Sequence, residues 1–221
     1  MINRGLFGGG AAHLGKSART RARLMDAAVR LFARDGFEAA SVNEIARLAD
    51  VANGTFYVHF RDKDAIGSEV ALAIARNVTR QLDEAMAGVD DAVDRTSMAT
   101  RRFIDLACSE PDWGHALLRA LWTFRGLRES VVGPLRSDLQ RGVDQGVFDV
   151  EIDDMLIDTF ASMVMGGLFA RLAGDSGADA GARVAELQLR MLGVPAERAR
   201  AAAWRTLEPV ALRLAPLPPT G

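Results

Sequence analysis

One short stretch of the chain gathers side chains that can hydrogen-bond to a polyanion. The hydroxyls of Thr55 and Tyr57 suit phosphate oxygens, and the imidazole of His59 can donate to a phosphate or to a base edge. Val58 offers an apolar contact for a thymine methyl group. No acidic residue stands between positions 53 and 61, so nothing there repels a phosphodiester. This combination indicates contact with duplex DNA, although capped helices with polar outer faces also occur in ordinary helical domains.

Two short helices joined by a tight turn must position these side chains, and residues 41–60 carry the signals for both. Ser41 and Glu44 match the S-x-x-E capping box, in which each side chain satisfies an unpaired backbone N–H of the first turn. A helix is therefore expected to begin at Ser41. The apolar residues that follow at spacings of three and four, and so predict one buried stripe, are Val42, Ile45, Ala46 and Ala49.

The turn and the second helix follow at once. Asp50 tolerates the left-handed backbone conformation better than most residues, which favours a sharp reversal there. Asn53 offers an N-cap side chain, and Gly54 lets the backbone approach a bulky ligand closely. Phe56 and Phe60 are four residues apart and predict the buried face of this helix, which leaves the polar group outside.

This region resembles the DNA-binding domain of the TetR family of transcriptional regulators over residues 17–77. Before the capping box runs R-x-x-L-M-D-A-A-V-R-L-F-A-R-D-G-F, with apolar residues at helical spacing and Gly36 as a helix stop. After the turn, G-T-F-Y-V-H-F-R-D-K-D-A-I resembles the family pattern, in which a glycine, a hydroxyl residue and aromatics lead to a lysine at the next helix start. Two positions depart from the pattern, because Asp50 replaces the usual glycine and Ala52 the usual Ser or Thr cap.

The resemblance implies which residues meet DNA. Asp62 would cap the next helix and place the Lys63 ammonium and the free N–H groups of that helix at one phosphate. Spacing alone would make Lys63 a solvated surface lysine. The expected DNA-binding set is Ser41, Asn53, Gly54, Thr55, Tyr57, Val58, His59 and Lys63.

The charge distribution agrees with DNA binding at the N-terminal end, whereas the total charge does not. The chain carries 27 basic and 29 acidic residues, a net charge of -2. Residues 1–63 nevertheless hold ten basic against six acidic residues. The residues before the first acid, Asp26, could lie along phosphates, enter the minor groove, or only aid solubility. The basic ones are Arg4, Lys16, Arg19, Arg21 and Arg23.

Composition sets the remaining bounds. Hydrophobic residues make up 49% of 221, enough for one large or two modest domains, and the single Cys108 fits a reducing, cytoplasmic compartment. The longest apolar run, Thr159 to Ala170, has twelve uncharged residues and is too short to cross a bilayer. We therefore expect a flexible basic leader at 1–16, a DNA-binding domain at 17–77, a second helical domain at 78–214 and a tail at 215–221, with no membrane segment.

An all-α fold is predicted, with an N-terminal three-helix helix-turn-helix domain followed by a larger helical ligand-binding and dimerisation domain. Ala, Leu, Arg and Met dominate the second part, and no window alternates as a strand does. Helix breaks are expected near Gly88, Pro111, Gly126, Gly133–Pro134, Gly146–Val150, Gly174–Gly181 and Gly193–Pro195.

The second domain carries aromatic and Met-rich segments that can line an adaptable apolar pocket, or can simply form its core. The resemblance implies a cavity for a small apolar or amphipathic inducer. The candidate ligand-binding residues are Phe103, Trp113, Leu117, Trp122, Phe160, Met163 and Phe169.

The segment from Asp153 to Leu172 is also the expected homodimer interface. Its small residues would allow close helix approach, and its apolar surface exceeds what one protomer could cover. A partner helix is expected between Ala182 and Leu192. The small residues are Ala161, Gly166, Gly167 and Ala170.

An enzyme is the rival class. Glu110, Asp112 and His115 surround Trp113, but Pro and acids there also fit an ordinary helix start. The three histidines are scattered without partners for a metal, and no cofactor-binding fingerprint occurs. The sequence thus favours a dimeric, ligand-responsive repressor that binds a palindromic operator over a small-molecule-binding protein or enzyme with an idle DNA-binding face.

Overall fold

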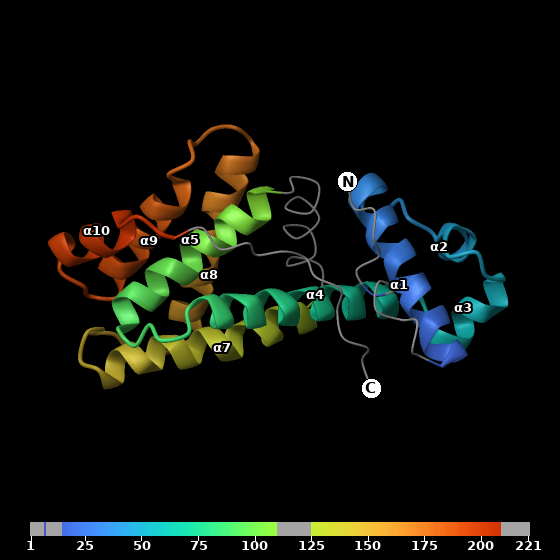
Figure 1. Ribbon diagram of the computed structural model, residues 1–221, viewed down its shortest axis with the longest axis horizontal. Helices are drawn as coiled ribbons and strands as arrows, with labels where there is room; N and C mark the ends of the chain where they lie inside the picture. Colours follow the sequence, from blue (N-terminus) through green and yellow to red (C-terminus); the bar gives the residue numbers. More distant parts are fainter. Residues whose placement is uncertain (1–6, 8–14, 110–124, 209–221) are drawn as a thin grey trace. The chain divides into compact units, whose positions relative to one another are not determined.

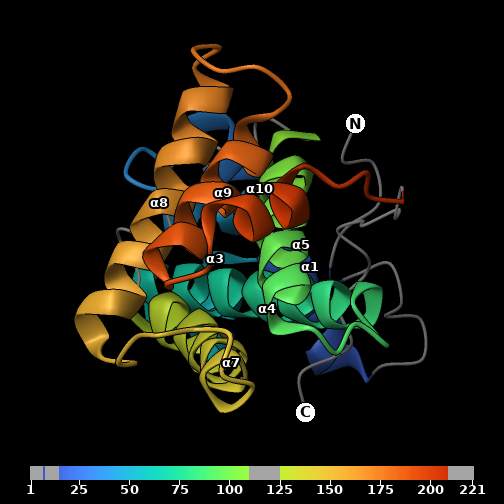
Figure 2. The ribbon, with the colours of Figure 1, turned by 90° about the vertical axis from the view of Figure 1, so that its left-hand side faces the viewer.

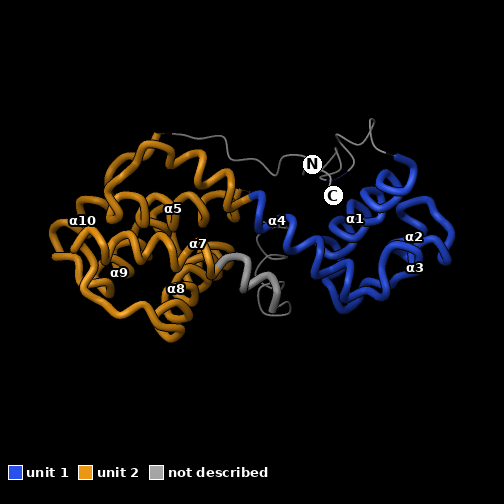
Figure 3. The backbone as a smooth tube through the Cα atoms, turned by 90° about the horizontal axis from the view of Figure 1, so that it is seen from below, with its two compact units in different colours: residues 1–77, 119–127, 214–221 blue, residues 78–118, 128–213 orange. Residues whose placement is uncertain are grey.

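The computed structural model of the protein describes Phe7, residues 15–109 and residues 125–208, without the side chains of 125–131. These residues form nine helices and no strand, which confirms the predicted all-α class (Figure 1). They divide between two compact units, and the division falls inside α4, after Asn77 (Figure 3).

The first unit contains the helices expected to bind DNA. They are α1 (Lys16–Asp35), α2 (Val42–Leu48), α3 (Asn53–His59) and the first part of α4 (Lys63–Ala85). Their apolar faces meet in a core whose fully buried members are Leu24, Leu31, Ile45, Phe56 and Ile66.

Local signals account for the ends of these short helices. The Ser41 hydroxyl accepts from the Glu44 N–H at 3.3 Å, while the Glu44 carboxylate accepts from the Ser41 N–H at 3.1 Å, so the predicted capping box is present. Gly36 ends α1 with a φ of 82° and donates its N–H to the Phe32 carbonyl at 3.1 Å. Both predictions are confirmed.

The second unit is built from the rest of α4, from α5 (Ala92–Ser109), nearly all of α7 (Arg125–Asp144), α8 (Asp154–Leu172), α9 (Ala180–Met191) and α10 (Ala196–Trp204). Helix α9 packs on α5, α8 and α10 (Figure 2). A buried polar link fixes this packing, because Gln188 of α9 accepts from Thr100 of α5 at 2.7 Å and donates to the Phe160 carbonyl of α8 at 3.0 Å.

Helix α7 corrects one of the expected breaks. Gly133 and Pro134 lie inside it rather than between helices. Gly126 is its second residue, and residues 110–124 lie outside the described part of the chain, so the break expected near Gly126 stays a prediction. Proline removes only one bond from the ladder of a 20-residue helix, and the packing of α7 against the core overrides that local loss. The breaks near Gly88, Gly146 and Gly193 are confirmed, with φ values of 82°, 67° and 86°. The one expected at Pro111 lies outside the described residues.

Candidate DNA interface and ligand-binding unit

Helix α3 has one buried and one exposed face, as predicted. Phe56 is fully buried and Phe60 nearly so, with ring centroids 5.8 Å apart. Tyr57 and Val58 point outward, with 57% and 79% of their surfaces exposed. Thr55 and His59 are half-buried beside them. The outer face therefore presents polar and apolar groups on a helix that two phenylalanines anchor.

The start of α3 differs from the expected one. Ala52, not Asn53, is the N-cap, and no side chain caps this helix. Asn53 is the first helical residue, and its side-chain amide instead donates to the Asn43 carbonyl oxygen of α2. The first turn closes through the backbone, because the Thr55 N–H donates to the Ala52 carbonyl at 2.8 Å. A Cβ added at Gly54 would meet nothing within 4 Å, which leaves room for another molecule there.

The turn between α2 and α3 is held by an arginine from α1. Asp50 adopts a φ of 52°, which confirms the predicted left-handed reversal. Arg23 donates to the Asp50 carbonyl at 3.0 Å, to its carboxylate at 3.1 Å, and to the Ala49 carbonyl. Sequence reasoning missed this role, because Arg23 lies 27 residues before Asp50 and nothing in its local spacing signals the contact.

Some residues of the expected basic N-terminal arm belong to a helix and support the fold of the first unit. Arg19, Arg21 and Arg23 belong to α1. Arg21 forms an ion pair with Glu69 and lies 4.9 Å from the centre of the Phe60 ring, so it braces the back of α3. Arg4 lies outside the described residues. The nearest described residue is Phe7, which is buried and donates its N–H to the buried Asp26 carboxylate at 2.8 Å.

The start of α4 combines a confirmed cap with an additional contact. The Asp62 carboxylate accepts from the Ala65 N–H at 2.7 Å, as predicted. Lys63 is the first helical residue, but its ammonium donates to the carbonyls of Phe37 and Glu38, at 2.8 and 3.1 Å, and lies 4.6 Å from the centre of the Phe37 ring. It therefore braces the connection between α1 and α2, and one of its three N–H donors remains for another acceptor.

Apart from half-buried Thr55 and His59, the predicted DNA-binding residues fall into two groups. Asn53, Gly54, Tyr57 and Val58 are exposed on α3. Ser41 and Lys63 are half-buried and each already serves the local fold, Ser41 as a cap and Lys63 as a brace. Burial of the phenylalanine pair and exposure of α3 give the geometry that reading a DNA groove requires.

The predicted ligand-binding residues differ in burial where the structure describes them. Phe160 belongs to the core of the second unit, whereas Phe169 is 64% exposed. Phe103 and Met163 are half-buried. Trp113, Leu117 and Trp122 lie outside the described residues.

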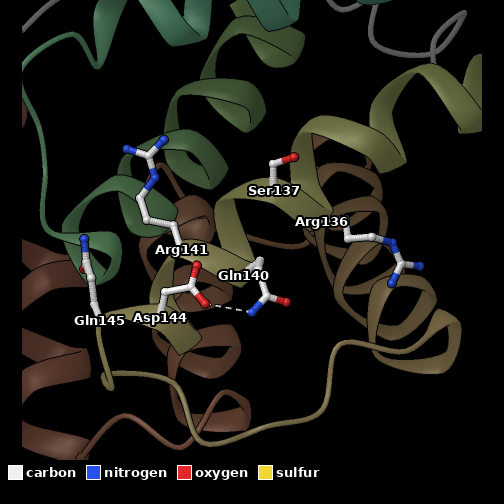
Figure 4. A pocket seen from close by; sticks show the side chains of 6 residues that line it. All are labelled: Arg136, Ser137, Gln140, Arg141, Asp144 and Gln145. Atoms are coloured by element: carbon white, nitrogen blue, oxygen red, sulfur yellow. Dashed lines mark hydrogen bonds between the residues drawn. The ribbon is translucent and has the colours of Figure 1, made fainter.

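A shallow hollow lies along α7, and residues with polar side chains line it (Figure 4). In it, Gln140 donates to Asp144 at 3.0 Å, and Gln145 donates to the Asp90 carbonyl at 2.7 Å. None of the predicted apolar ligand-binding residues that the structure describes lines it. Its residues are Arg136, Ser137, Gln140, Arg141, Asp144 and Gln145.

Helix α8 exposes an unusual amount of apolar surface. Met155 and Phe169 are 73% and 64% exposed. Over the part of the chain described, α8 is the one helix long and apolar enough to cross a membrane by length and composition. Only 17% of its apolar stretch is buried inside the protein. The expected absence of a membrane segment stays a prediction, because it was argued from the uncharged run 159–170 and this longer stretch also includes the charged Asp158.

The two neighbouring glycines of α8 have different surroundings. A Cβ added at Gly166 would meet nothing within 4 Å, so this glycine faces outward. A Cβ at Gly167 would instead collide with Cγ2 of Val184 in α9 and lie 3.3 Å from Cδ1 of Ile104 in α5. Gly167 therefore serves packing within the protomer, which corrects its assignment to the dimer interface.

Comparison with known proteins agrees with this architecture. The family described as "Bacterial regulatory proteins, tetR family" matches residues 24–70, and "Tetracyclin repressor-like, C-terminal domain" matches residues 91–205, about half of the chain. The first match spans the helices around α3, and the second spans most of the second unit.

Relatives extend over most of the chain. The HTH-type transcriptional repressor AcnR of Corynebacterium glutamicum is 28% identical over 164 residues, which cover 72% of this chain and 84% of that protein. The uncharacterized HTH-type transcriptional regulator YerO of Bacillus subtilis is 33% identical over 69 residues, but these cover only 30% of this chain and 24% of that protein.

Among solved structures, RolR in complex with resorcinol superposes with a TM-score of 0.71 and 27% identity, covering 89% of this chain and 98% of that one. The N-terminal match, the C-terminal match and this superposition agree. The chain therefore belongs to the TetR family of DNA-binding transcriptional regulators.

Proposed function

We propose that this regulator is a cytoplasmic homodimeric repressor that binds a palindromic operator and responds to a small molecule. The observation that carries the proposal is α3, which two buried phenylalanines anchor while Asn53, Tyr57 and Val58 stand exposed. A helix supported in this way can enter the major groove without disturbing the core.

The two kinds of contact on this surface have different consequences. Tyr57 and Lys63 carry donors suited to phosphate oxygens, which fix position without reading sequence. Asn53, Thr55 and Val58 would face base edges, where amides, hydroxyls and methyl groups discriminate bases. Gly54 permits close approach of the backbone, and His59 can serve either purpose.

The dimer is proposed to form through the outer faces of α8 and α9. Met155 and Phe169 on α8 and Leu187 on α9 are each more than half exposed, although each is large and apolar. Such surfaces favour a protein partner. A second copy offers the same faces in two-fold symmetry and places two recognition helices at half-sites about 34 Å apart.

A ligand is proposed to bind within the second unit. RolR, which superposes over most of this chain, was crystallised with resorcinol, a small aromatic molecule. Half-buried Phe103 and Met163 are the described candidates for its apolar contacts. A ligand that shifts α4 would change the spacing of the recognition helices, and a coupling of about 1–3 kcal/mol is typical of such switches.

One experiment tests DNA binding directly. Sites selected from random DNA by the purified protein should share a palindromic sequence, and affinity for them should fall steeply as salt rises. A small-molecule-binding protein or enzyme with an idle DNA-binding face would select no common sequence. That result would refute the proposal. If a site is selected, a screen against the complex would then seek the molecule that disrupts it.

Substitutions on α3 sharpen the test. Tyr57→Phe should weaken binding to all operator variants alike, whereas Val58→Ala should change which variant is preferred. Arg200→Ala, a substitution on α10 at a side chain that is 71% exposed, is the control and should leave sequence preference unchanged. Equal effects of Tyr57→Phe and Val58→Ala on every variant would contradict the division of roles.

A further inference from the structure

Arg102, on α5, carries a buried charge that no described carboxylate neutralises. Only 7% of the residue is exposed. One terminal nitrogen donates to the Ala85 carbonyl at 2.7 Å, while Nε is buried and has no hydrogen-bond partner among the described residues. Burial lowers the pKa of the guanidinium, because desolvation disfavours its charged form.

Two other shielded arginines of the same unit do have carboxylate partners. Arg95 is almost as buried, but it meets the carboxylates of Asp83 and Asp138. Arg171, also shielded, meets Asp105. A buried guanidinium without a counter-charge is strongly unfavourable, so natural proteins keep one where it serves a purpose.

Capping of α4 explains only part of the arrangement. Ala85 is the last residue of α4, and its carbonyl carries part of the negative end of the helix dipole. The helix has no basic residue of its own in its last turn, so Arg102 supplies one. A guanidinium has five donors, however, and this contact uses one nitrogen.

We propose that Arg102 binds the carboxylate of a small organic acid, as the charged contact of the ligand site in the second unit; this inference rests on the function proposed above. The planar fork of a guanidinium matches a carboxylate through two parallel hydrogen bonds. Buried Leu106, one turn further along α5, and buried Met86, next to Ala85, supply apolar surface in the same region. The ligand class is therefore a carboxylate on an apolar or aromatic body.

The test measures thermal unfolding of the full chain with sodium formate, acetate and benzoate, against sodium chloride at equal ionic strength. Benzyl alcohol provides the ring without the charge. The wild-type melting temperature should rise saturably with the carboxylates, most with benzoate, and should not rise with benzyl alcohol. In Arg102→Met the carboxylate response should vanish, while the melting temperature in chloride stays close to that of the wild type.

Control variants keep the interpretation clear. Arg136→Met removes an arginine of the same unit that pairs with exposed Asp154, and it should retain the full response. If Arg102→Met fails to fold, Arg102→Gln keeps a donor for the Ala85 carbonyl and should still lose the response. Equal responses of the wild type and the folded variant, or no carboxylate response in the wild type, would overturn the proposal.

The same preparations separate this inference from the proposed function. Arg102→Met should bind the selected operator with wild-type affinity, and benzoate should weaken that complex only in the wild type. If carboxylates raise the melting temperature but no DNA site is selected, the proposed repressor function is wrong and Arg102 is still an anion-binding residue. If a DNA site is selected but carboxylates do not raise the melting temperature, only the proposed role of Arg102 is wrong.

Discussion

Nε of Arg95 donates to Oδ1 of Asp138 at 2.9 Å, and this bond joins α5 to α7. The same guanidinium donates to Asp83 of α4 at 2.7 Å and lies 3.4 Å from the Met86 carbonyl, just beyond the end of α4. The Arg95 side chain is only 12% exposed. One shielded arginine therefore fastens the C-terminal end of α4 to two other helices of the second unit.

Replacing this arginine should destabilise the second unit. Arg95→Met removes hydrogen bonds to two carboxylates and leaves Asp138 without this partner, and we expect a loss of about 2–3 kcal/mol in the free energy of unfolding. Urea denaturation followed by circular dichroism measures it. Arg80→Met, which removes an exposed pair with Glu84 on α4, should change stability by less than about 0.5 kcal/mol. Equal losses for both variants would show that the Arg95 contacts stabilise the protein no more than an exposed ion pair does.

The buried glycine of α8 should not tolerate a side chain. In Gly167→Ala, the new methyl group would overlap Val184 and press on Ile104, and a loss of about 1–3 kcal/mol is expected from overpacking. Gly133→Ala is the matched control, because its Cβ would meet nothing within 4 Å inside α7. It should change stability by less than about 0.5–1 kcal/mol, because the following Pro134 crowds the new Cβ and opposes the gain in helix propensity. Thermal unfolding of both variants gives the comparison, and a neutral Gly167→Ala would mean that α8 and α9 move apart easily.

Short-range patterns predicted most of the first unit. The capping box depends on residues three apart, the reversal depends on Asp50 itself, and the buried pair Phe56 and Phe60 is four residues apart. The contacts of Lys63 with Phe37 and of Arg21 with Glu69 were missed, because their partners lie 26 and 48 residues away. The spacing of residues along the sequence does not indicate which distant side chains the fold will bring into contact.

In the second unit the sequence predicted helices but not their orientation. Gly166 and Gly167 are neighbours of the same type, and only the rotation of α8 against α9 decides that one faces outward and the other inward. The weak local signal of Pro134 was likewise overridden by packing along α7. The buried charge of Arg102 could not be seen in the sequence, because α5 carries Arg101 and Arg102 side by side and only the packing of the helices places Arg102 against the end of α4.

Acid should weaken the start of α5. Burial alone would raise the pKa of Asp91, but the N–H groups of Asp94 and Val93 and the charge of Arg198 outweigh it and hold the pKa below its usual value. A carboxyl with a lowered folded pKa stabilises fully above its unfolded pKa, about 3.9, and loses this effect as pH falls through the folded value.

Asp91→Asn should therefore flatten the acid side of the stability profile. Asparagine keeps the cap but not the charge, so the variant should be less stable than the wild type near pH 7 and approach it as pH falls below about 3.9. Urea unfolding between pH 3 and 7 measures the difference. A constant gap between the two proteins at all pH values would show that the Asp91 charge does not contribute.

Lys63 should affect both stability and DNA binding, and salt separates the two effects. Lys63→Ala removes two hydrogen bonds and the contact with the Phe37 ring, so the free energy of unfolding should fall by about 1–2 kcal/mol. Arg61→Ala, at a neighbouring side chain that is 86% exposed, should change stability by less than about 0.5 kcal/mol.

The salt dependence of operator binding then identifies any phosphate contact of Lys63. If its third N–H donor reaches a phosphate, Lys63→Ala lowers affinity for every operator variant and reduces the slope of log affinity against log salt by about 0.9 for each half-site. Fluorescence anisotropy with the selected operator, at temperatures where both proteins stay folded, measures that slope. An unchanged slope with lowered stability would leave Lys63 as a brace for the helices behind α3, because a lost phosphate contact must release fewer counterions.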